Sequence, residues 1–457
     1  MALPKRFPDR EEVATVRALA DQLEPGSEGE SVHRLAGRVL ARRDMGKLVF
    51  ADVVDRSGRM QLLMRPGDLG DMHVDLGDVI GVSGVATKTK RGEPSLDVRE
   101  IVLLGKIRSP LPDTFHGVTD TEVRYRKRYL DLLMNEESRA ETLLRSRTVA
   151  AMRRRLDDWG FVEVETPILQ PRYGGAFAEP FVTHYNELGA EYYLRIATEL
   201  YLKRLIVGGL EKVYEIGKDF RNEGVSYKHN PEFTMLEWYE AYADYTDTMA
   251  RMEALVSGVA EEVVGTTRAT FRGHSVDLTS WQRVKLIDAL GAEGLWTRDP
   301  DELRARLEER NADTHHDRTW AQLLDHALTA FVEPALVQPT ILYDYPVELS
   351  PFARATDDDP SIVERFEYFV GGMELGNAFT EINDSEEQAA RFAMQAQEVA
   401  AGVLEAEHGD PDYVEALSYG MPPTGGLGLG IDRLTMVLAG KDSIRDVILF
   451  PALRERP

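Results

Sequence analysis

The residue types best suited to chemistry gather in one stretch, residues 213–245, which reads VYEIGKDFRNEGVSYKHNPEFTMLEWYEAYADY. Its two apolar runs, Val213–Phe220 and Phe233–Tyr239, flank a polar loop that contains glycine, asparagine and proline, and this pattern predicts a β-hairpin. Because side chains alternate along a strand, Arg221 and Glu223 fall on one face. The same alternation groups four residues of the second run: Phe233, Met235, Glu237 and Tyr239.

A face that combines an arginine, a histidine, an aromatic ring and several acids suits a nucleotide together with a second, cationic ligand. The alternative is a solvated hairpin whose charges pair with one another, which is a common arrangement for charged residues on strands. The hairpin alone leaves both interpretations open.

Length and composition limit the class of protein. A chain of 457 residues with 43% hydrophobic residues predicts two to four domains with an ample core. It contains no cysteine, which excludes disulfides and cysteine-ligated zinc and fits a reducing compartment. No N-terminal apolar segment resembles a secretion signal, and no run approaches the roughly 18 apolar residues of a membrane span. We therefore expect a cytoplasmic protein that is neither secreted nor embedded in a membrane.

The net charge of −24 argues at first against a nucleic-acid partner. Its distribution weakens that objection. Residues 1–110 carry 18 Lys and Arg against 17 Asp and Glu, a net charge of +1, so the remainder carries −25. The first part of the chain is therefore electrically distinct and remains compatible with RNA.

The elements before residue 136 form a separate pattern. Residues 1–30 predict a short helix over Glu11–Leu23 and a polar tail, with no assigned function. Residues 31–112 contain five short β runs separated by glycine turns, which predicts an OB-fold barrel, a fold that often binds single-stranded nucleic acid. Phe50 would stack a base and Gln61 would contact a base edge. The alternative is that Phe50 fills the barrel core.

Residues 113–135 predict a hinge with a basic cluster that either contacts RNA phosphates or forms a solvated helix face. The catalytic part is expected at 136–457, with a helix over Glu141–Trp159, a strand over Phe161–Thr166 and strands again in the last third. The other elements expected there are helices Thr198–Val207, Asp247–Val264, Trp281–Leu290, Pro300–Arg310, Thr319–Val332 and Ser385–His408. The predicted fold class is α+β: a five-stranded barrel followed by an antiparallel sheet flanked by helices.

Three stretches together resemble the motifs of class II aminoacyl-tRNA synthetases, and more narrowly of lysyl-tRNA synthetases. The FRNEG, HNPEFT and EWYEAYADY segments of residues 213–245 resemble motif 2. GFVEVETP, within about 145–167, resembles motif 1, and GGLGLGIDR, within about 425–440, resembles motif 3. Residues 246–345 then correspond to a helical insertion. The resemblance covers the chain from about Ser31 onward.

This resemblance implies ATP-dependent attachment of L-lysine to tRNA(Lys) through a lysyl-adenylate. Arg221 would hold the amino-acid carboxylate and the α-phosphate, and Arg433 with His229 would neutralise the outer phosphates, which makes the two arginines the catalytic residues. Glu367 and Glu374 would hold Mg²⁺, since hard cations take carboxylate and phosphate oxygens. The expected ATP-binding set is Arg221, Glu223, His229, Asn230, Phe233, Glu367, Glu374, Gly428 and Arg433.

The amino-acid site is expected to be an acidic hole, because its residues include three glutamates and a tyrosine. An acidic substrate would need an arginine or lysine opposite its side chain, whereas excess carboxylate calls for an ammonium ligand. By resemblance, Glu381 and Tyr239 receive the ε-ammonium, and Glu199 with the Gly175 backbone receives the α-ammonium. The full lysine-binding set is Gly175, Glu199, Glu237, Tyr239, Asn377, Phe379 and Glu381.

The resemblance also implies that Phe50, Gln61 and Glu100 read the anticodon and that the motif 1 helix and strand form a homodimer interface. The chain departs from many relatives at Glu179, where they have a basic residue, and at Thr198, where they have proline. Two alternatives remain: a synthetase paralogue with another amino-acid or acceptor choice, and a non-catalytic RNA-binding paralogue. ATP–pyrophosphate exchange stimulated by lysine would separate them from the first hypothesis.

Overall fold

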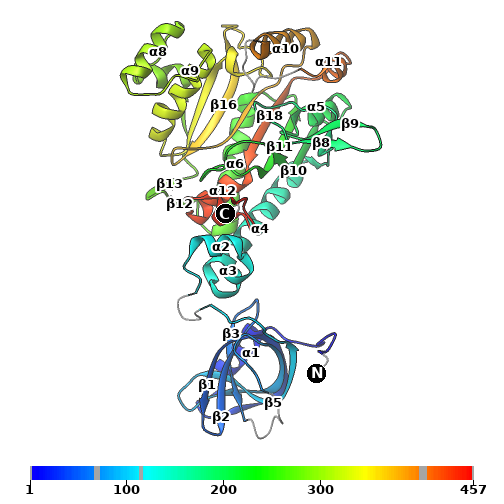
Figure 1. Ribbon diagram of the computed structural model, residues 1–457, viewed down its shortest axis with the longest axis vertical. Helices are drawn as coiled ribbons and strands as arrows, with labels where there is room; N and C mark the ends of the chain where they lie inside the picture. Colours follow the sequence, from blue (N-terminus) through cyan, green and yellow to red (C-terminus); the bar gives the residue numbers. More distant parts are fainter. Residues whose placement is uncertain (1–2, 66–72, 113–116, 401–408, 455–457) are drawn as a thin grey trace. The chain divides into compact units, whose positions relative to one another are not determined.

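The computed structural model describes residues 3–65, 73–112, 117–400 and 409–454. The chain divides into two compact units, residues 1–135 and residues 136–457 (Figure 1). Parts of the expected barrel, of the expected hinge and of the expected helix Ser385–His408 fall at 66–72, 113–116 and 401–408 and lie outside the described residues.

The first unit contains a closed five-stranded barrel, which confirms the predicted OB-fold. Its strands follow the order β1-β2-β3-β5-β4, and β4 closes the barrel by pairing with β1. Their bounds are β1 (Glu28–Met45), β2 (Leu48–Val54), β3 (Arg59–Met64), β4 (Val79–Lys88) and β5 (Pro94–Gly105). Alternate residues such as Val53, Leu62 and Leu96 point inward and are fully buried.

Helix α1 (Val13–Asp21) packs onto this barrel through Val13, Val16 and Ala20, which belong to the barrel core. Two short helices, α2 (Thr121–Arg126) and α3 (Arg128–Met134), follow the barrel. Arg124 and Arg128 both pair with the buried carboxylate of Asp131. Arg124 therefore links α2 to α3, whereas the Arg128 pair lies within α3.

The second unit is built on an eight-stranded sheet in the order β14-β15-β16-β17-β18-β11-β10-β6. The strands are β6 (Val162–Glu163), β10 (Lys212–Phe220), β11 (Glu232–Ala241), β14 (Gln282–Lys285), β15 (Thr340–Pro346), β16 (Ile362–Val370), β17 (Met373–Thr380) and β18 (Thr424–Gly430). The sheet is antiparallel except at its two edges, where β6 pairs parallel with β10 and β14 parallel with β15. The expected antiparallel sheet is thus a mixed one.

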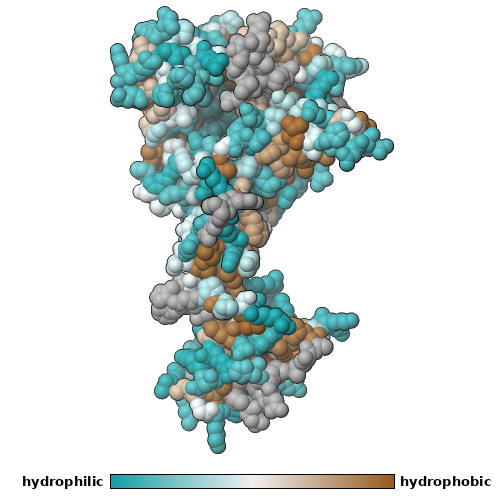
Figure 2. Space-filling model, viewed as in Figure 1, coloured by the Kyte–Doolittle hydropathy of each residue, from teal (hydrophilic) through white to brown (hydrophobic). Residues whose placement is uncertain are grey.

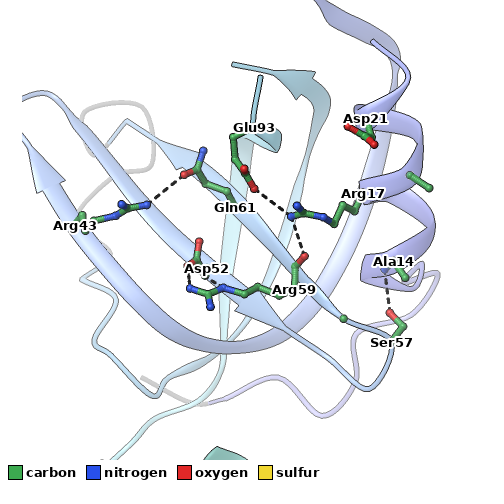
Figure 3. A pocket seen from close by; sticks show the side chains of 11 residues that line it. Ala14, Arg17, Asp21, Arg43, Asp52, Ser57, Arg59, Gln61 and Glu93 are labelled. Atoms are coloured by element: carbon green, nitrogen blue, oxygen red, sulfur yellow. Dashed lines mark hydrogen bonds and ion pairs between the residues drawn. The ribbon is translucent and has the colours of Figure 1, made fainter. Parts of the chain in front are cut away.

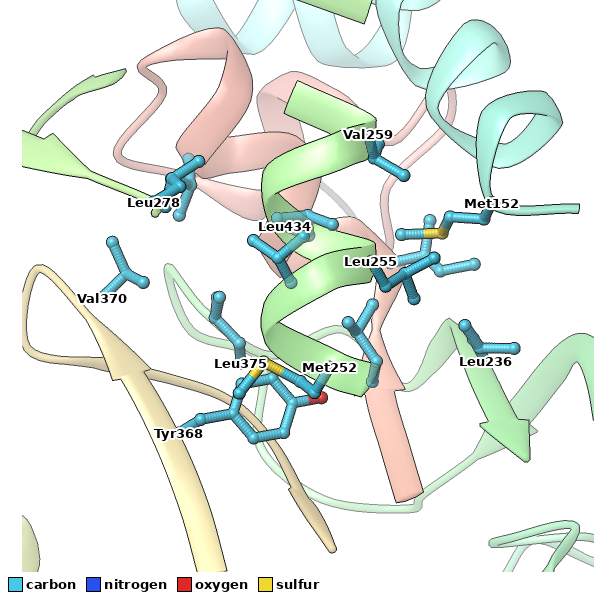
Figure 4. Packing of buried hydrophobic residues seen from close by; sticks show 14 of the residues in the cluster. Met152, Leu236, Met252, Leu255, Val259, Leu278, Tyr368, Val370, Leu375 and Leu434 are labelled. Carbon is cyan, nitrogen blue, oxygen red and sulfur yellow. The ribbon is translucent and has the colours of Figure 1, made fainter. Parts of the chain in front are cut away.

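Three helices cover the back face of the sheet: α4 (Glu136–Asp158), α6 (Tyr245–Val264) and α12 (Ile431–Ala439). Figure 4 shows Leu255 and Val259 of α6 among side chains from the sheet and from α12. Leu236 and Tyr368 reach this core from β11 and β16, and both are fully buried. A core of this size fixes the strand register on which the opposite, front face depends.

The front face is open at its centre because β18 alternates glycine with leucine. Leu427 and Leu429 point into the back core, so Gly426, Gly428 and Gly430 lie on the front. Antiparallel pairing aligns Gly426 with Tyr239 and Phe379, and Gly428 with Glu237 and Asn377. The glycines therefore form a floor without side chains, which lies between Glu237 and Tyr239 of β11 on one side and Asn377 and Phe379 of β17 on the other.

The second unit contains further elements outside the eight-stranded sheet and its three back helices. They are β7 (Leu169–Gln170), β8 (Val182–Tyr185), β9 (Ala190–Leu194), α5 (Glu199–Val207), β12 (Arg268–Phe271), β13 (His274–Asp277), α7 (Leu286–Ala292), α8 (Pro300–Glu309), α9 (Trp320–Ala327), the π-helix Leu328–Val332, α10 (Ser385–Ala400), α11 (Pro411–Leu417) and α13 (Ile444–Val447). Within the described residues, no helix combines the length and the apolar character needed to cross a lipid bilayer.

Two expected elements were wrong in part. The predicted helix Trp281–Leu290 begins as strand β14, because Gln282–Lys285 pairs with β15 at the sheet edge, and only then becomes α7. The predicted strand Phe161–Thr166 forms ladder pairs only at Val162 and Glu163. In both cases distant pairing decides where the strand lies, and local propensity does not report it.

Candidate active site

The front face of the sheet holds two adjoining cavities of similar size. The loop-side cavity, about 200 Å³, lies against the loop between β10 and β11 and the start of α12. The acidic cavity, about 210 Å³, lies over Gly426 and Gly428. Arg221, Met235 and Asn377 line both cavities, so the two spaces meet at these side chains.

Arg221 follows β10 directly and stands at the junction. Its guanidinium carbon lies 5.1 Å from the centre of the Phe233 ring, and its Nε donates to the Ile196 carbonyl at 3.4 Å. Among the described residues, no carboxylate lies within ion-pair distance of this guanidinium. The structure therefore supports Arg221 from behind and leaves a cation available for an anionic ligand.

The loop-side cavity gathers most of the residues expected to bind the nucleotide: Arg221, Glu223, His229, Asn230, Phe233, Glu374 and Arg433. Lys228 lines it as well and was missed by the sequence analysis, although it adjoins the expected histidine. Asn230 has a structural use, because its amide donates to the Glu232 carbonyl at 2.6 Å and accepts from the Ala452 amide at 3.1 Å. This residue closes the loop and ties it to the C-terminal segment.

His229 is neutral at neutral pH in the ligand-free protein. Desolvation by the surrounding loop, reinforced by the charges of Arg433 and Lys228, lowers the pKa of His229 to about 4. Its Nδ1 lies 2.9 Å from the Ser226 hydroxyl, which orients the ring. The positive charge expected to neutralise the phosphates is therefore supplied by Arg433 and Lys228, unless a bound anion raises the pKa of His229.

The expected metal-binding residues lie on the hairpin β16–β17. A bulge at Leu375 shifts the register there and brings Glu374 to the front face that also carries Glu367. Glu367 pairs with Arg365 at 2.6 Å and Glu374 pairs with Arg433 at 2.9 Å. Burial raises the pKa of Glu367 to about 7, with the Glu374 charge adding to the rise against the pull of Arg365.

These two carboxylates fit a magnesium ion, because Mg²⁺ usually takes one or two carboxylates together with phosphate oxygens and water. Among residues 3–65, 73–112, 117–400 and 409–454, no group of three or more metal-ligating side chains is close enough to hold an ion alone. A metal at this hairpin would need oxygens from a bound phosphate.

The acidic cavity contains the expected residues Gly175, Glu237, Tyr239, Asn377, Phe379 and Glu381. Glu237 Oε1 accepts from the Thr198 amide at 3.3 Å, and the Tyr239 hydroxyl donates to Glu237 Oε2 at 3.3 Å. Burial raises the pKa of Glu237 to about 8, and the charges of Asp219 and Glu199 add to the rise. A buried carboxylate of this kind favours a cationic partner.

Glu381 projects over the glycine floor. A side-chain carbon at Gly426 would lie 1.9 Å from Glu381 Oε1, so only glycine accommodates this carboxylate. Within the described protein, Glu381 Oε1 is buried and has no hydrogen-bond partner. A buried acceptor without a partner is costly, which marks this oxygen as a contact for a ligand donor.

The sequence analysis missed the cation behind this cavity. Lys203 of α5 is fully buried, and its Nζ lies 2.6 Å from both Glu199 Oε1 and Glu381 Oε2. The Glu199–Lys203 spacing of four residues on a helix was a visible signal. Glu199 is thus already paired, and it sits behind the lining, where a side-chain carbon at Gly175 would lie 3.2 Å from its Cβ.

A third cavity lies on the outer face of the barrel, between α1 and the strands (Figure 3). Gln61 lies at its wall, where its Nε2 donates to Ser95 Oγ at 2.8 Å and its Oε1 accepts from Arg43 at 3.4 Å. Phe50 pairs with Leu63, which follows Gln61 by two residues on β3. Phe50 therefore lies on the same outer face as Gln61 and does not fill the core. Glu100 is exposed on β5 opposite Ser83, on the side of the barrel toward β4.

Models of two protein families match the chain. Residues 120–454 match the model of class II tRNA synthetases for aspartate, lysine and asparagine (D, K and N), and residues 33–104 match the model of the OB-fold nucleic-acid-binding domain. The first match covers the second unit and the two helices before it. The second covers the barrel.

Curated relatives align over nearly the whole chain. A lysine–tRNA ligase of Halalkalibacterium halodurans is 50% identical over 92% of this chain and 86% of its own length. A lysine–tRNA ligase of Chloroflexus aurantiacus is 49% identical over 92% of this chain and 89% of its own. One from Staphylococcus aureus is 48% identical over 94% and 89%.

Proposed function

This chain belongs to the class II tRNA synthetases and, among them, to the lysine–tRNA ligases, and from that premise we propose that it attaches L-lysine to tRNA(Lys) with ATP as the second substrate. The observation that carries the proposal is the junction of the two cavities at Arg221. A buried acidic space on one side suits a diamino acid, and a cationic space on the other suits a nucleoside triphosphate.

The first step joins the two ligands at this junction. A carboxylate oxygen of lysine forms a bond to the α-phosphorus of ATP, the bond to the β-phosphate oxygen breaks, and pyrophosphate leaves. Arg221 contacts both cavities, so its planar guanidinium can hold the carboxylate and the α-phosphate at once. Positioning and charge stabilisation of this kind supply most of the catalysis in phosphoryl-type transfer.

The loop-side cavity holds the nucleotide. Phe233 stacks on adenine and Glu223 accepts from its exocyclic amine. Gly428, which lines the acidic cavity beside the junction, lets the ligand approach the sheet closely. Arg433 and Lys228 neutralise the outer phosphates. Bound phosphate raises the pKa of His229 from about 4, so the ring can become a charged donor in the complex.

Glu367 and Glu374 would hold Mg²⁺ when the phosphates are present, and the ion would supply positive charge beside the leaving pyrophosphate. Arg365 and Arg433 orient these carboxylates in the free protein. Arg433 therefore serves both the metal side and the phosphate side of the site.

The acidic cavity selects lysine. Glu381 Oε1, the buried acceptor over Gly426, and the Tyr239 hydroxyl receive the ε-ammonium. Glu237 lies on the adjoining strand. Glu199 does not line the cavity in the free protein but adjoins Gly175, and we propose that it receives the α-ammonium together with the Gly175 backbone when lysine binds. Asn377 supports the carboxylate at the junction, and Phe379 packs against the aliphatic part of the side chain.

In the second step the terminal adenosine of tRNA(Lys) accepts the lysyl group from the adenylate and AMP leaves. The barrel binds the anticodon, with Phe50 stacking a base and Gln61 contacting a base edge. Glu100 contributes from the neighbouring strand. Phe50→Ala should raise the KM for tRNA about tenfold, as expected for one lost base stack. Its ATP–pyrophosphate exchange without tRNA should equal that of the unaltered protein.

We also propose a homodimer that works in the cytoplasm. Much of the visible surface is hydrophilic (Figure 2), yet apolar side chains between β6 and β9 are exposed. They are Val162, Ile168, Leu169, Val182, Tyr185 and Leu188. Leu169→Glu should shift the protein from dimer to monomer in sedimentation, and a monomeric starting protein would contradict the proposal.

The central test is ATP–pyrophosphate exchange by the purified full chain with each amino acid in turn. Exchange stimulated by lysine and not by aspartate or asparagine, followed by charging of a tRNA pool, is the expected result. Exchange with another amino acid would point to the altered-specificity paralogue. RNA binding without any exchange would point to the non-catalytic one.

A further inference from the structure

Lys203 has surroundings that a simple structural salt bridge does not need. Its ammonium lies between two carboxylates, Glu199 and Glu381, at 2.6 Å from each. It also lies over three aromatic rings, at 4.9 Å from Phe352, 5.7 Å from Phe379 and 5.4 Å from Tyr413. Carboxylates and aromatic rings together form a cage that suits an ammonium ion, and in this protein the ammonium group of Lys203 occupies it.

The cage stands directly behind the lysine site. Phe352, Phe379 and Glu381 line the acidic cavity on one side and contact Lys203 on the other. Lys203 holds Glu381 through Oε2, which leaves Oε1 of the same carboxylate as the buried acceptor over Gly426. The internal ammonium and the substrate ammonium therefore share one carboxylate.

We propose that Lys203 is a specificity-determining positioning residue. Its positive charge balances one of the three negative charges around the acidic cavity, so that the other two match the two ammonium groups of a single lysine molecule. The proposal rests on the lysine-ligase function proposed above. The three carboxylates are Glu199, Glu237 and Glu381. Arg365, the other cation at the cavity, is already balanced by Glu367, and the substrate carboxylate is balanced by Arg221.

This charge balance explains why the cavity can be buried and still select a cation. With lysine bound, the negative charges of Glu199, Glu237 and Glu381 are matched by Lys203 and by the two ammonium groups of the ligand, whereas an uncharged side chain would leave one of these carboxylates unmatched. Without Lys203, even correctly bound lysine would leave a surplus negative charge. The groups that face Lys203 keep it positively charged. Although burial opposes the charge, Glu199 and Glu381 raise the pKa of Lys203 well above its ordinary value, and Tyr413 acts in the same direction.

A mutant cycle in the full chain tests the proposal with lysine-dependent exchange. Lys203→Met removes the cation at similar length, and Glu199→Gln removes one acid at nearly constant shape. Each single change leaves one unmatched buried charge and should raise the KM for lysine about tenfold or more, with kcat within about threefold. The double variant restores the balance, so its KM should be at least about threefold lower than that of either single variant.

A purely structural role of Lys203 predicts the opposite, because the packing lost in the two substitutions would add up and raise the KM of the double variant further. A double variant worse than both single variants would overturn the proposal, as would Lys203→Met with an unchanged KM for lysine. In Lys203→Met a proton shared by Glu199 and Glu381 can replace the lost cation at low pH and dissociates as the pH rises, so the ratio of its KM for lysine to that of the unaltered protein should rise between pH 6.5 and 8.5. Parallel pH profiles would also count against it. The other titratable or charged groups near Glu199 and Glu381 are Glu237, Tyr239, Tyr413 and Arg365.

Lys441→Met is the matched control, because Lys441 also pairs with two glutamates, Glu137 and Glu141, and none of these three residues lines the acidic cavity. It should leave the KM for lysine unchanged. If Lys203→Met does not fold, as judged by thermal unfolding, Lys203→Gln takes its place in the same cycle. Absence of lysine-stimulated exchange in the unaltered protein would refute the proposed function itself, an outcome distinct from any result of the cycle.

Discussion

The two cavities that meet at Arg221 have nearly equal volumes, about 200 and 210 Å³, but they are built from different parts of the fold. The loop-side cavity is walled by the connection between β10 and β11, by the bulged strand β17 and by the start of α12. The acidic cavity is walled mainly by the paired strands β11, β16, β17 and β18 and by the segments 175–177 and 350–353, with Glu237 and Glu381 almost completely buried.

Their charges are handled differently as well. In the acidic cavity, the carboxylates are paired internally through Lys203 and Thr198 before any ligand arrives. In the loop-side cavity, Arg221 has no acidic partner among the described residues and His229 is kept neutral. Under the proposed function, the difference means that the amino acid is selected where charges are buried and prearranged, and that the reaction takes place beside Arg221, the cation left available for a phosphate.

The largest expected effect comes from the residue that the two cavities share. Arg221→Gln should lower kcat for ATP–pyrophosphate exchange by about 10³-fold, because it removes the cation that stabilises developing charge at the α-phosphate. Thermal stability should change little, since the guanidinium makes only one long hydrogen bond. Arg354→Gln is the control, an exposed arginine that pairs with Asp357. If Arg221→Gln left kcat for exchange unchanged, there would be no basis for treating the junction as the reaction site.

Two glycines of β18 that both line the acidic cavity differ in what an added side chain would meet. A side-chain carbon at Gly426 would lie 1.9 Å from Glu381 Oε1, whereas one at Gly428 would lie 3.2 Å from the flexible end of Met235. Gly426→Ala should therefore raise the KM for lysine about 100-fold, as expected when a buried charged contact is displaced. Gly428→Ala should change it only severalfold. Equal effects of the two substitutions on lysine would mean that the Glu381 oxygen over Gly426 is not the contact that selects lysine.

The hairpin and the barrel were predictable because their signals are local. Turn residues and apolar alternation place β10 and β11 within a residue or two, and the register then pairs Glu215 with Glu237 and Gly217 with Met235. The acidic hole followed from residue types along two predicted strands. Five short runs with glycine turns were likewise enough for the barrel.

The parts that sequence reasoning missed depend on contacts between distant residues. Lys203 pairs with Glu381, which is 178 residues away, so only its Glu199 contact on the same helix was visible. The bulge at Leu375 that turns Glu374 to the front face leaves no turn signature. Strand β14 exists because β15 is available beside it, and its sequence alone predicted a helix.

Proton release should distinguish the acidic cavity from the loop-side cavity. Glu237 has a pKa of about 8 in the free protein, so it is mostly protonated at pH 7, and a bound ammonium lowers that pKa. Lysine binding at pH 7 should therefore release protons, as measured by calorimetry in buffers of different ionisation enthalpy. Glu237→Gln should reduce the release by up to one proton per site, and an unchanged release would contradict the assignment.

The same shift has a consequence for stability. Because the pKa of Glu237 is raised above that of the unfolded chain, its contribution is present below about pH 4.5 and is lost as the pH rises through about 8. The free energy of unfolding should thus fall between those values by at most about 1.4 kcal/mol per pH unit from this group. Glu237→Gln should flatten that decline in denaturant titrations without lysine.

The smallest expected effect concerns the loop that forms the other cavity. Asn230→Ala removes the bonds to Glu232 and Ala452, which close the loop and tie it to the C-terminal segment. Because the loop carries His229 and Lys228, the KM for ATP should rise about three- to tenfold, in line with the loss of one or two hydrogen bonds. The KM for lysine should stay within twofold of its starting value, since the acidic cavity is held by the sheet and α5. A shift in the KM for lysine as large as that for ATP would show that the loop supports both cavities, and the contrast between them would then be one of charge alone.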